Sequence, residues 1–434
     1  MQRPCLAAFG IALLSWLLFG AFALSAMPDT LDRPLPEYFY LWDSEIFRSI
    51  AEHGYRFELE MSDSGRNWET NNVAYPPLYP FFSSLAQGLF DLSWPTALTL
   101  VANAATVAAL SLWILIAMRL RVKGHWIFLM LLVFALYPGS LWLLTGYSDA
   151  LSLALAFTIL LVALGVLEDP SRRRAVLLFV LGLLLGLTHF RTSVLTAGGV
   201  MIGLTWWARG LMDTLSWQEK RRIALLQFLP VLGAMLAMLG FFAYCHLAFG
   251  RWDAYQQTIF GVWGPSTPSF LQIFDWSIYS WFEVSLAQDR FGQSTPFLGR
   301  FLSTWMLTIS VGLLVFEVFI GTTPAAISQR LSYSPGLWAL LLSLLMQFFL
   351  ITMRVPSLNN FTEYPMPSVR YLIPCALLLG LYLAQLLPEI VRRRNASDTH
   401  SNAIAIAVCV AMLPGGMALQ QNMFELFYQR ILQG

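Results

Sequence analysis

Long apolar segments without charged residues constrain this chain more than any other feature of its sequence. Residues 6–26 and 126–144 are two such segments, and each approaches the ~20 residues that a helix needs to cross a bilayer. Hydrophobic residues make up 57% of the chain and charged residues only 12%, against roughly 25% charged residues in soluble domains. Since strands of membrane barrels are short and alternate in polarity, the sequence predicts an all-α polytopic membrane protein.

About eleven apolar segments reach spanning length by hydropathy, and 76–92 is a candidate for a further partial span. The first follows Met1-Gln2-Arg3 but exceeds the apolar core of a signal peptide, so we interpret it as a retained helix. The predicted spans are 6–26, 97–118, 126–144, 149–167, 175–190, 194–209, 223–249, 300–320, 336–352, 368–388 and 402–420. The chain is then one membrane domain, 1–434, with two long loops at 27–96 and 250–299.

Basic residues cluster in alternate connections of this predicted bundle. Cytoplasmic loops are enriched in Lys and Arg, so the connections that carry these clusters are predicted to be cytoplasmic. The clusters are Arg119, Arg121 and Lys123; Arg172, Arg173 and Arg174; Lys220, Arg221 and Arg222; and Arg392, Arg393 and Arg394. Loops 27–96 and 250–299, the turns near 145 and 191, and residues 353–367 then lie outside. The first loop is rich in acidic residues and both long loops are rich in aromatic residues, which places the chemistry on the external side.

The first loop contains a short amphipathic segment, residues 42–55. Ile46, Phe47 and Ile50 recur at helical spacing, and Gly54 is a typical residue at a helix end. We therefore predict a helix that lies in the membrane interface. Asp43 stands at its start, where an acid is either a helix cap or a general base at the boundary between water and lipid.

Several motifs in the chain resemble one family of membrane enzymes. They are Trp42-Asp43, Phe47, Ile50-Ala51, Gly54-Tyr55, Ala74-Tyr75-Pro76-Pro77-Leu78-Tyr79-Pro80, Tyr147-Ser148-Asp149, Thr188-His189-Phe190-Arg191-Thr192 and Arg370-Tyr371. This pattern is similar to the PIG-V family, which adds the second mannose to glycosylphosphatidylinositol in eukaryotes and has bacterial relatives. The family belongs to the multispanning C-type glycosyltransferases (GT-C), which use polyprenyl-phosphate sugars and have an essential acid in the first external loop.

That resemblance implies a bundle of GT-C type, an inverting mannosyl transfer on the extracytoplasmic face, and Asp43 as the base. The implied partners are a polyprenyl-phosphate sugar donor, a lipid or glycan acceptor and the surrounding lipids. The eukaryotic proteins have Tyr-Ser-Glu where this chain has Asp149, and Arg-Ser-Asn-Gly where it has Arg191-Thr192-Ser193-Val194. They also have an aromatic pair where this chain has Tyr75-Pro76. These departures favour a bacterial relative in the inner membrane with a periplasmic site; a eukaryotic chain would have a lumenal site in the endoplasmic reticulum.

Other candidate site residues have two interpretations each. Arg370 and Arg191 either bind the donor phosphate through their guanidinium groups or extend from helix ends towards lipid headgroups. Asp149 is either a second acid or a cap on the helix that follows. Rings in the external region, such as Trp42, Tyr75, Tyr79 and Tyr371, suit either substrate contacts or the interfacial aromatic belt.

Several function classes lack their sequence signatures. The chain has no Asp-x-Asp pair, no P-loop and no paired-histidine metalloprotease helix, and we predict no cofactor and no metal. A net charge of +1 gives no indication of nucleic-acid binding. The alternative from another class is a transporter or flippase, for which polar groups at the bilayer midplane are typical. A lipid-binding protein without catalysis is the second alternative.

Overall fold

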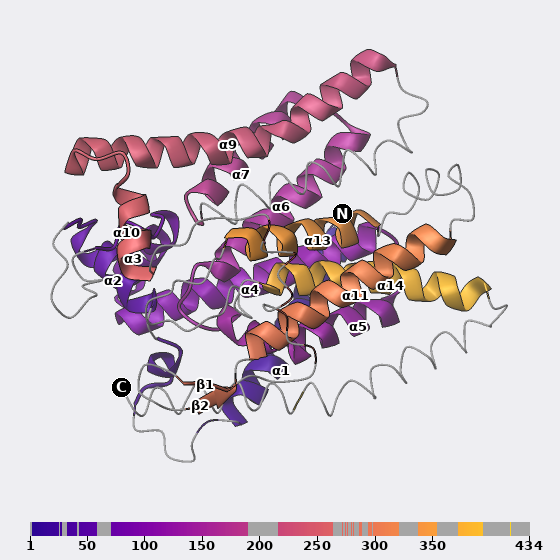
Figure 1. Ribbon diagram of the computed structural model, residues 1–434, viewed down its shortest axis with the longest axis horizontal. Coiled ribbons are helices and arrows are strands. Elements are labelled where there is room, and N and C mark those ends of the chain that lie inside the picture. The colour runs from indigo at the N-terminus through magenta and orange to yellow at the C-terminus, as the bar shows by residue number, and fades with distance from the viewer. Residues whose placement is uncertain are drawn as a thin grey trace.

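Helices form nearly all of the regular structure in the computed structural model, as the apolar segments predict (Figure 1). The structure describes residues 2–25, 27, 33–40, 43–58, 71–189, 216–263, 298–320, 337–353 and 372–393, with a few positions between 271 and 296 and one at 417. The α-helices are α1 (Gln2–Ser25), α2 (Asp43–His53), α3 (Leu78–Phe90), α4 (Trp94–Arg119), α5 (Gly124–Leu136), α6 (Asp149–Glu168), α7 (Arg172–Gly186), α9 (Trp217–Phe249), α10 (Ala254–Trp263), α11 (Leu298–Ile320), α13 (Leu337–Met353) and α14 (Ile373–Arg393).

Two smaller kinds of element accompany them, 3-10 helices and a β-hairpin. Two 3-10 helices, η1 (Leu35–Phe39) and η2 (Pro138–Leu143), flank the region of Asp43 and the approach to α6. An antiparallel hairpin, β1 (Leu286–Gln288) with β2 (Ser294–Pro296), lies in the second long loop. The sequence patterns do not predict this hairpin, whose strands have three residues each.

Within the described residues, four helices are long and apolar enough to cross a membrane: Pro4–Ser25, Trp94–Arg119, Asp149–Val166 and Trp217–Phe249. Shorter apolar helices cover Gly124–Leu136, Thr304–Phe316, Ala339–Phe348 and Ile373–Leu386. Each of these coincides with a predicted span. The spans predicted at 194–209 and 402–420 fall outside the described residues.

The prediction of one continuous helix over 126–144 is wrong. Helix α5 ends at Leu136, Tyr137 is extended with φ −73° and ψ 118°, and η2 begins at Pro138. Proline lacks an N–H donor and disfavours the helical conformation of the residue before it. The break leaves residues 137–148 as an irregular segment between α5 and α6.

Helix α9 begins earlier than the predicted residue 223. Ser216 and Glu219 form a capping box, in which the Ser216 hydroxyl accepts from the Glu219 N–H and the Glu219 carboxylate accepts from the Ser216 N–H. Arg221 and Arg222 therefore lie in the first turns of α9, and Arg172–Arg174 begin α7, whereas the sequence pattern places both clusters in loops.

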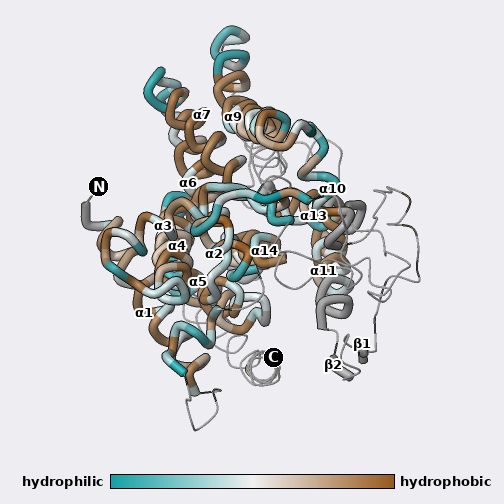
Figure 2. Tube along the Cα trace, turned by 90° about the vertical axis from the view of Figure 1, so that its left-hand side faces the viewer, coloured by the Kyte–Doolittle hydropathy of each residue, from teal (hydrophilic) through white to brown (hydrophobic). Residues whose placement is uncertain are grey.

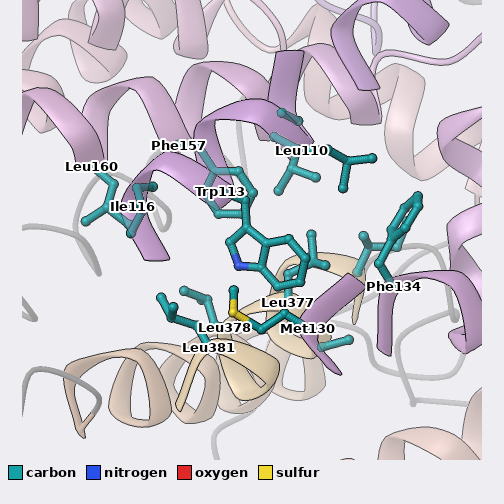
Figure 3. Packing of buried hydrophobic residues seen from close by; sticks show 14 of the residues in the cluster. Leu110, Trp113, Ile116, Met130, Phe134, Phe157, Leu160, Leu377, Leu378 and Leu381 are labelled. Atoms are coloured by element: carbon teal, nitrogen blue, oxygen red, sulfur yellow. The ribbon is translucent and has the colours of Figure 1, made fainter. Parts of the chain in front are cut away.

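The main core joins α1, α4, α5, α6, α13 and α14. Trp113 of α4 is fully buried, and its indole lies among Met130 of α5 and Leu378 and Leu381 of α14 (Figure 3). Segments more than 260 residues apart in the chain thus share one apolar interior. In a bilayer, where lipid tails are as apolar as these side chains, such contacts stabilise the bundle through close van der Waals packing.

Helices α7 and α9 run side by side at one edge of the molecule (Figures 1 and 2). Their backbones approach closely because glycines stand at the contact. A Cβ on Gly182 would collide with the backbone of Pro230, and one on Gly186 would lie 2.7 Å from the Ala234 carbonyl oxygen. Gly182 and Gly186 have the four-residue spacing that allows close helix contact in membranes.

Helices α2 and α3 pack against each other and against α4, and Figure 1 shows them at one end of the bundle. The predicted first-loop helix is confirmed, and Gly54 ends it with φ +77°. Its apolar residues Ile46, Phe47 and Ile50 are buried in protein. Helix α3 instead exposes an apolar stripe, Phe81, Leu85 and Leu89, at helical i, i+4 spacing.

Candidate active site

Asp43 is the first residue of α2, and only 7% of its surface is exposed. The Tyr75 hydroxyl donates a hydrogen bond of 3.0 Å to the Asp43 Oδ1. A buried carboxylate needs such donors, because leaving its charge unpaired in the interior is costly. The position at a helix N-terminus adds the favourable end of the helix dipole.

Aromatic rings enclose this carboxylate on the side of α3. Phe47, one helical turn after Asp43, meets the Tyr75 ring edge-on with centroids 5.3 Å apart and the Tyr79 ring with centroids 4.9 Å apart. Tyr79 is fully buried, and its hydroxyl donates to the Leu98 carbonyl of α4 at 2.8 Å. The two tyrosines predicted from the Tyr75–Pro80 motif therefore lie together beside α2, with Tyr75 bonded to Asp43 and Tyr79 bonded to α4.

A second contact brings the Tyr147-Ser148-Asp149 motif to the same place. The Ser44 hydroxyl donates to the Gly146 carbonyl at 3.1 Å, and the Gly146 N–H donates to the Phe39 carbonyl at 3.0 Å. A Cβ on Gly146 would lie only 3.0 Å from the Ser44 Oγ and 3.1 Å from the Leu98 Cβ. Glycine at 146 is thus what allows α2, α4 and this segment to meet.

Asp149 is the first residue of α6, and Ser148 before it occupies the cap position without a side-chain cap bond. An acid in the first turn of a helix favours the helix dipole, and the two interpretations of Asp149, a second acid or a cap, stay predictions. Burial raises the pKa of the Tyr79 phenol well above its usual value, and the charge of Asp149 raises it further. Asp149 thus lies within electrostatic range of Tyr79.

Polar side chains of α4 hold the irregular segment before Asp149. Asn103 donates to the Leu144 carbonyl at 3.0 Å and accepts from the Trp16 indole at 2.7 Å. Thr106 donates to the Leu143 carbonyl at 2.7 Å. Backbone groups without helical partners are tolerated inside a membrane bundle only where protein groups satisfy them, and these two side chains do so here.

Tyr55, just after α2, fixes the backbone on which Tyr75 stands. Its hydroxyl donates to the Tyr75 carbonyl at 2.7 Å, and its ring packs against Phe241 and Tyr244 near the end of α9. Burial raises the pKa of the Tyr55 phenol well above its usual value, so this donor keeps its proton at neutral pH. Through Tyr55 and Tyr75, the C-terminal end of α9 is connected to Asp43.

The end of α7 reaches the same region. The Leu78 N–H at the start of α3 donates to the Leu187 carbonyl at 2.9 Å. Thr188 and His189, which begin the motif Thr188-His189-Phe190-Arg191-Thr192, therefore lie next to α3. The remaining predicted site residues, Trp42, Arg191, Arg370 and Tyr371, fall outside the described residues.

Among the residues that the structure describes, no group of three His, Cys, Asp or Glu side chains could hold a metal ion. The described part of the site therefore consists of one buried carboxylate with a phenol donor, a second acid near a buried tyrosine, and a frame of aromatic rings. Such a set can accept a proton from a hydroxyl and bind the face of a sugar.

Sequence reasoning did not single out Ser44, Gly146 or Asn103. Ser44 was assigned to the polar face of the first-loop helix, and Asn103 is a polar residue inside an apolar segment. A polar residue in a span is a signal that can be used, because it must find a partner within the bundle. Gly146 directly precedes the Tyr-Ser-Asp motif, but its role depends on a contact with a residue 102 positions away.

The helical fold is similar to that of solved proteins. Similar solved structures include ArnT from Cupriavidus metallidurans bound to undecaprenyl phosphate, at a TM-score of 0.50 and 14% identity over 98% of this chain and 75% of that one. ArnT from the same organism in the apo state has a TM-score of 0.47 and 14% identity over 97% and 76% of the two chains. At this identity the first likeness shows a shared fold. No family model matches the chain, and no curated protein matches it in sequence.

Proposed function

We propose that this protein is a membrane glycosyltransferase that moves a sugar from a polyprenyl-phosphate donor to a hydroxyl of a lipid or glycan acceptor. The observation that carries the proposal is the buried carboxylate of Asp43, held by Tyr75 at the end of the bundle where the first-loop helix packs. The fold shared with ArnT, which was solved bound to undecaprenyl phosphate, supports a polyprenyl-phosphate lipid as the donor class.

The proposed reaction needs a base, a leaving group and protection from bulk water. Asp43 takes the proton from the acceptor hydroxyl as its oxygen attacks the anomeric carbon of the sugar. The bond between that carbon and the phosphate oxygen breaks, so polyprenyl phosphate leaves and the configuration of the anomeric carbon inverts. Phe47, Tyr75 and Tyr79 form a largely buried aromatic wall beside the carboxylate, which limits the access of competing water.

The finer assignments extend this proposal. Mannose as the sugar rests on the resemblance of the first-loop motifs to the PIG-V family, and Arg370, Tyr371 and Arg191 are the proposed ligands of the donor phosphate. Asp149 is proposed to bind the sugar or the acceptor beside Tyr79. The site is proposed to face the exterior of a bacterial inner membrane, because the basic clusters Arg172–Arg174 and Lys220–Arg222 lie at the opposite ends of their helices from α2 and α3.

Transfer of radiolabelled sugar by the purified protein tests this proposal. The protein is reconstituted in vesicles and given polyprenyl-phosphate mannose, or the corresponding glucose lipid, with a membrane extract that supplies acceptors. We expect labelled product from the mannose lipid. Product from the glucose lipid alone would show that the sugar is glucose and not mannose, and the protein would still be a glycosyltransferase. If neither donor gives product and the donor lipid passes between the leaflets, the protein is a flippase and not a transferase.

A further inference from the structure

Positive charge is concentrated at the N-terminal ends of α7 and α9. The proposed reaction does not use it. The segments 168–174 and 217–222 contain six basic residues against three acidic ones. The Arg222 guanidinium donates to the Pro170 carbonyl at 2.8 Å, which fixes the start of α9 beside the turn that precedes α7. The two basic clusters, 46 to 50 residues apart in the chain, therefore form one surface.

The arginines of this surface divide into two kinds. Arg174 and Arg222 are bonded to the protein: Arg174 donates to the Gly165 and Asp169 carbonyls and pairs with the Asp169 carboxylate, and Arg222 bonds Pro170. Arg172, Arg173 and Arg221 are exposed and have no hydrogen bond or ion pair with any described residue. Two of the three nearby acids are engaged elsewhere, since Asp169 pairs with Arg174 and Glu219 caps α9.

Apolar side chains continue directly along both helices from these arginines. On α7, Val176 and Leu177 are one turn beyond Arg172 and Arg173 and are 57% and 44% exposed. On α9, Leu225 and Phe228 follow Arg221 and are 59% and 43% exposed. Figure 2 shows the same pattern, with hydrophilic ends on both helices next to hydrophobic stretches.

We propose that this surface is a binding site for an anionic phospholipid. Arg172, Arg173 and Arg221 hold the phosphate, because their positive charges attract an anionic headgroup and their N–H groups donate to its oxygens. The acyl chains lie on the exposed apolar side chains of α7 and α9. A zwitterionic lipid fits less well, since its own cation would face three arginines. The site is independent of the proposed sugar transfer and needs only that the helices cross a membrane.

The basic cluster between α4 and α5 differs from the arginines at the N-terminal ends of α7 and α9. Arg119 and Lys123, in the cluster between α4 and α5, both have interactions with other residues of the protein. Arg172, Arg173 and Arg221, by contrast, have no hydrogen bond or ion pair with any residue that the structure describes.

Native mass spectrometry of the full-length protein in detergent tests the proposal, with dioleoyl-phosphatidylglycerol and dioleoyl-phosphatidylcholine as probes. We expect phosphatidylglycerol to bind the wild type tighter than phosphatidylcholine, and the triple change Arg172→Gln, Arg173→Gln, Arg221→Gln to weaken it by about tenfold or more. The matched control, Arg119→Gln, Arg121→Gln, Lys123→Gln, removes the same charge elsewhere and is expected to bind as the wild type does.

A second variant keeps the test decisive if the glutamine variant does not fold. Changing the same three arginines to lysine retains the charge and is expected to keep the preference for phosphatidylglycerol within about threefold. Equal binding of the two lipids by the wild type would overturn the proposal. So would an equal loss of phosphatidylglycerol binding in the control variant, or loss of binding in a folded lysine variant.

Discussion

At the scale of single residues, the site depends on one carboxylate that the protein encloses and one phenol that orients it. Asp43 is 7% exposed and accepts from Tyr75 at 3.0 Å. Phe47 holds the Tyr75 ring edge-on, and Tyr55 holds its backbone. Because each of these contacts restricts the next, the orientation of Asp43 is set by residues that need not touch substrate.

Replacing Tyr75 by phenylalanine should slow transfer without unfolding the protein. The ring contact with Phe47 is retained, while the hydrogen bond to Asp43 is lost. A hydrogen bond to a charged group contributes about 1.5–3 kcal/mol, so we expect kcat to fall roughly tenfold. Steady-state kinetics measure this, and Tyr382→Phe, which removes a buried phenol from α14, serves as the control. A wild-type kcat for Tyr75→Phe would show that this bond has no part in the reaction.

The sequence predicted the main site residues that the structure describes, but not the residues that hold them in place. Asp43, Tyr75 and Tyr79 were assigned from the first-loop motifs, and the structure brings them together. Asp149 lies at the start of α6, and side-chain periodicity fixes the first residue of a helix only to within one or two positions. Ser44 and Asn103 were missed because their partners lie far away in the chain.

At the scale of elements, two features of the packing are specific enough to test. The first is the contact between α7 and α9, which depends on the absence of side chains at Gly182 and Gly186. The second is the irregular segment before α6, whose carbonyls are satisfied from α4. Both lie where local sequence alone predicts something simpler: two independent spans in one case and an uninterrupted helix in the other.

Gly182→Leu should destabilise the protein strongly. Any Cβ at position 182 collides with the Pro230 backbone, and backbone cannot move aside as a flexible side chain can. We expect a loss of roughly 3 kcal/mol or more, in the range of severe overpacking, and a clear fall in the melting temperature in detergent. Gly240→Leu is the matched control, because a Cβ on Gly240 meets nothing within 4 Å. Equal melting temperatures for the two variants would contradict the close α7–α9 contact.

Asn103→Leu should destabilise the segment that leads to Asp149. The change leaves the Leu144 carbonyl and the Trp16 indole without this partner, and each buried group left unpaired costs about 1–3 kcal/mol. Thermal unfolding should therefore occur at a lower temperature than in Ser111→Ala, which removes only a bond within α4 itself. If Asn103→Leu unfolds no earlier than that control, α4 does not support this segment as described.

At the scale of the whole molecule, the fold is the part that hydropathy predicts best. Every described helix of spanning length coincides with a predicted span, because an apolar segment of that length has few alternatives in lipid. The hairpin of β1 and β2 and the interruption at Pro138 were not predicted. The strands have only three residues each, and the interruption comes from Pro138, whose effect on the backbone a hydropathy scale does not register.

The basic clusters make a testable prediction about orientation. A single cysteine at Arg56, just after α2, should react from outside intact cells with a membrane-impermeant maleimide, and one at Ser171, before α7, should react only after permeabilisation. The native Cys5, Cys245, Cys375 and Cys409 are first replaced by alanine. Labelling of both positions from the same side would show that the predicted topology is wrong.

The most direct measurement of the central claim compares transfer by the wild type with transfer by Asp43→Asn. Asparagine keeps the size of the side chain and can still accept from Tyr75, but it cannot take a proton from an acceptor. The wild type should form labelled product from a polyprenyl-phosphate sugar, and the folded Asp43→Asn protein should lose about 100-fold or more of that rate. Full activity of a folded Asp43→Asn protein would contradict the assignment of Asp43 as the base.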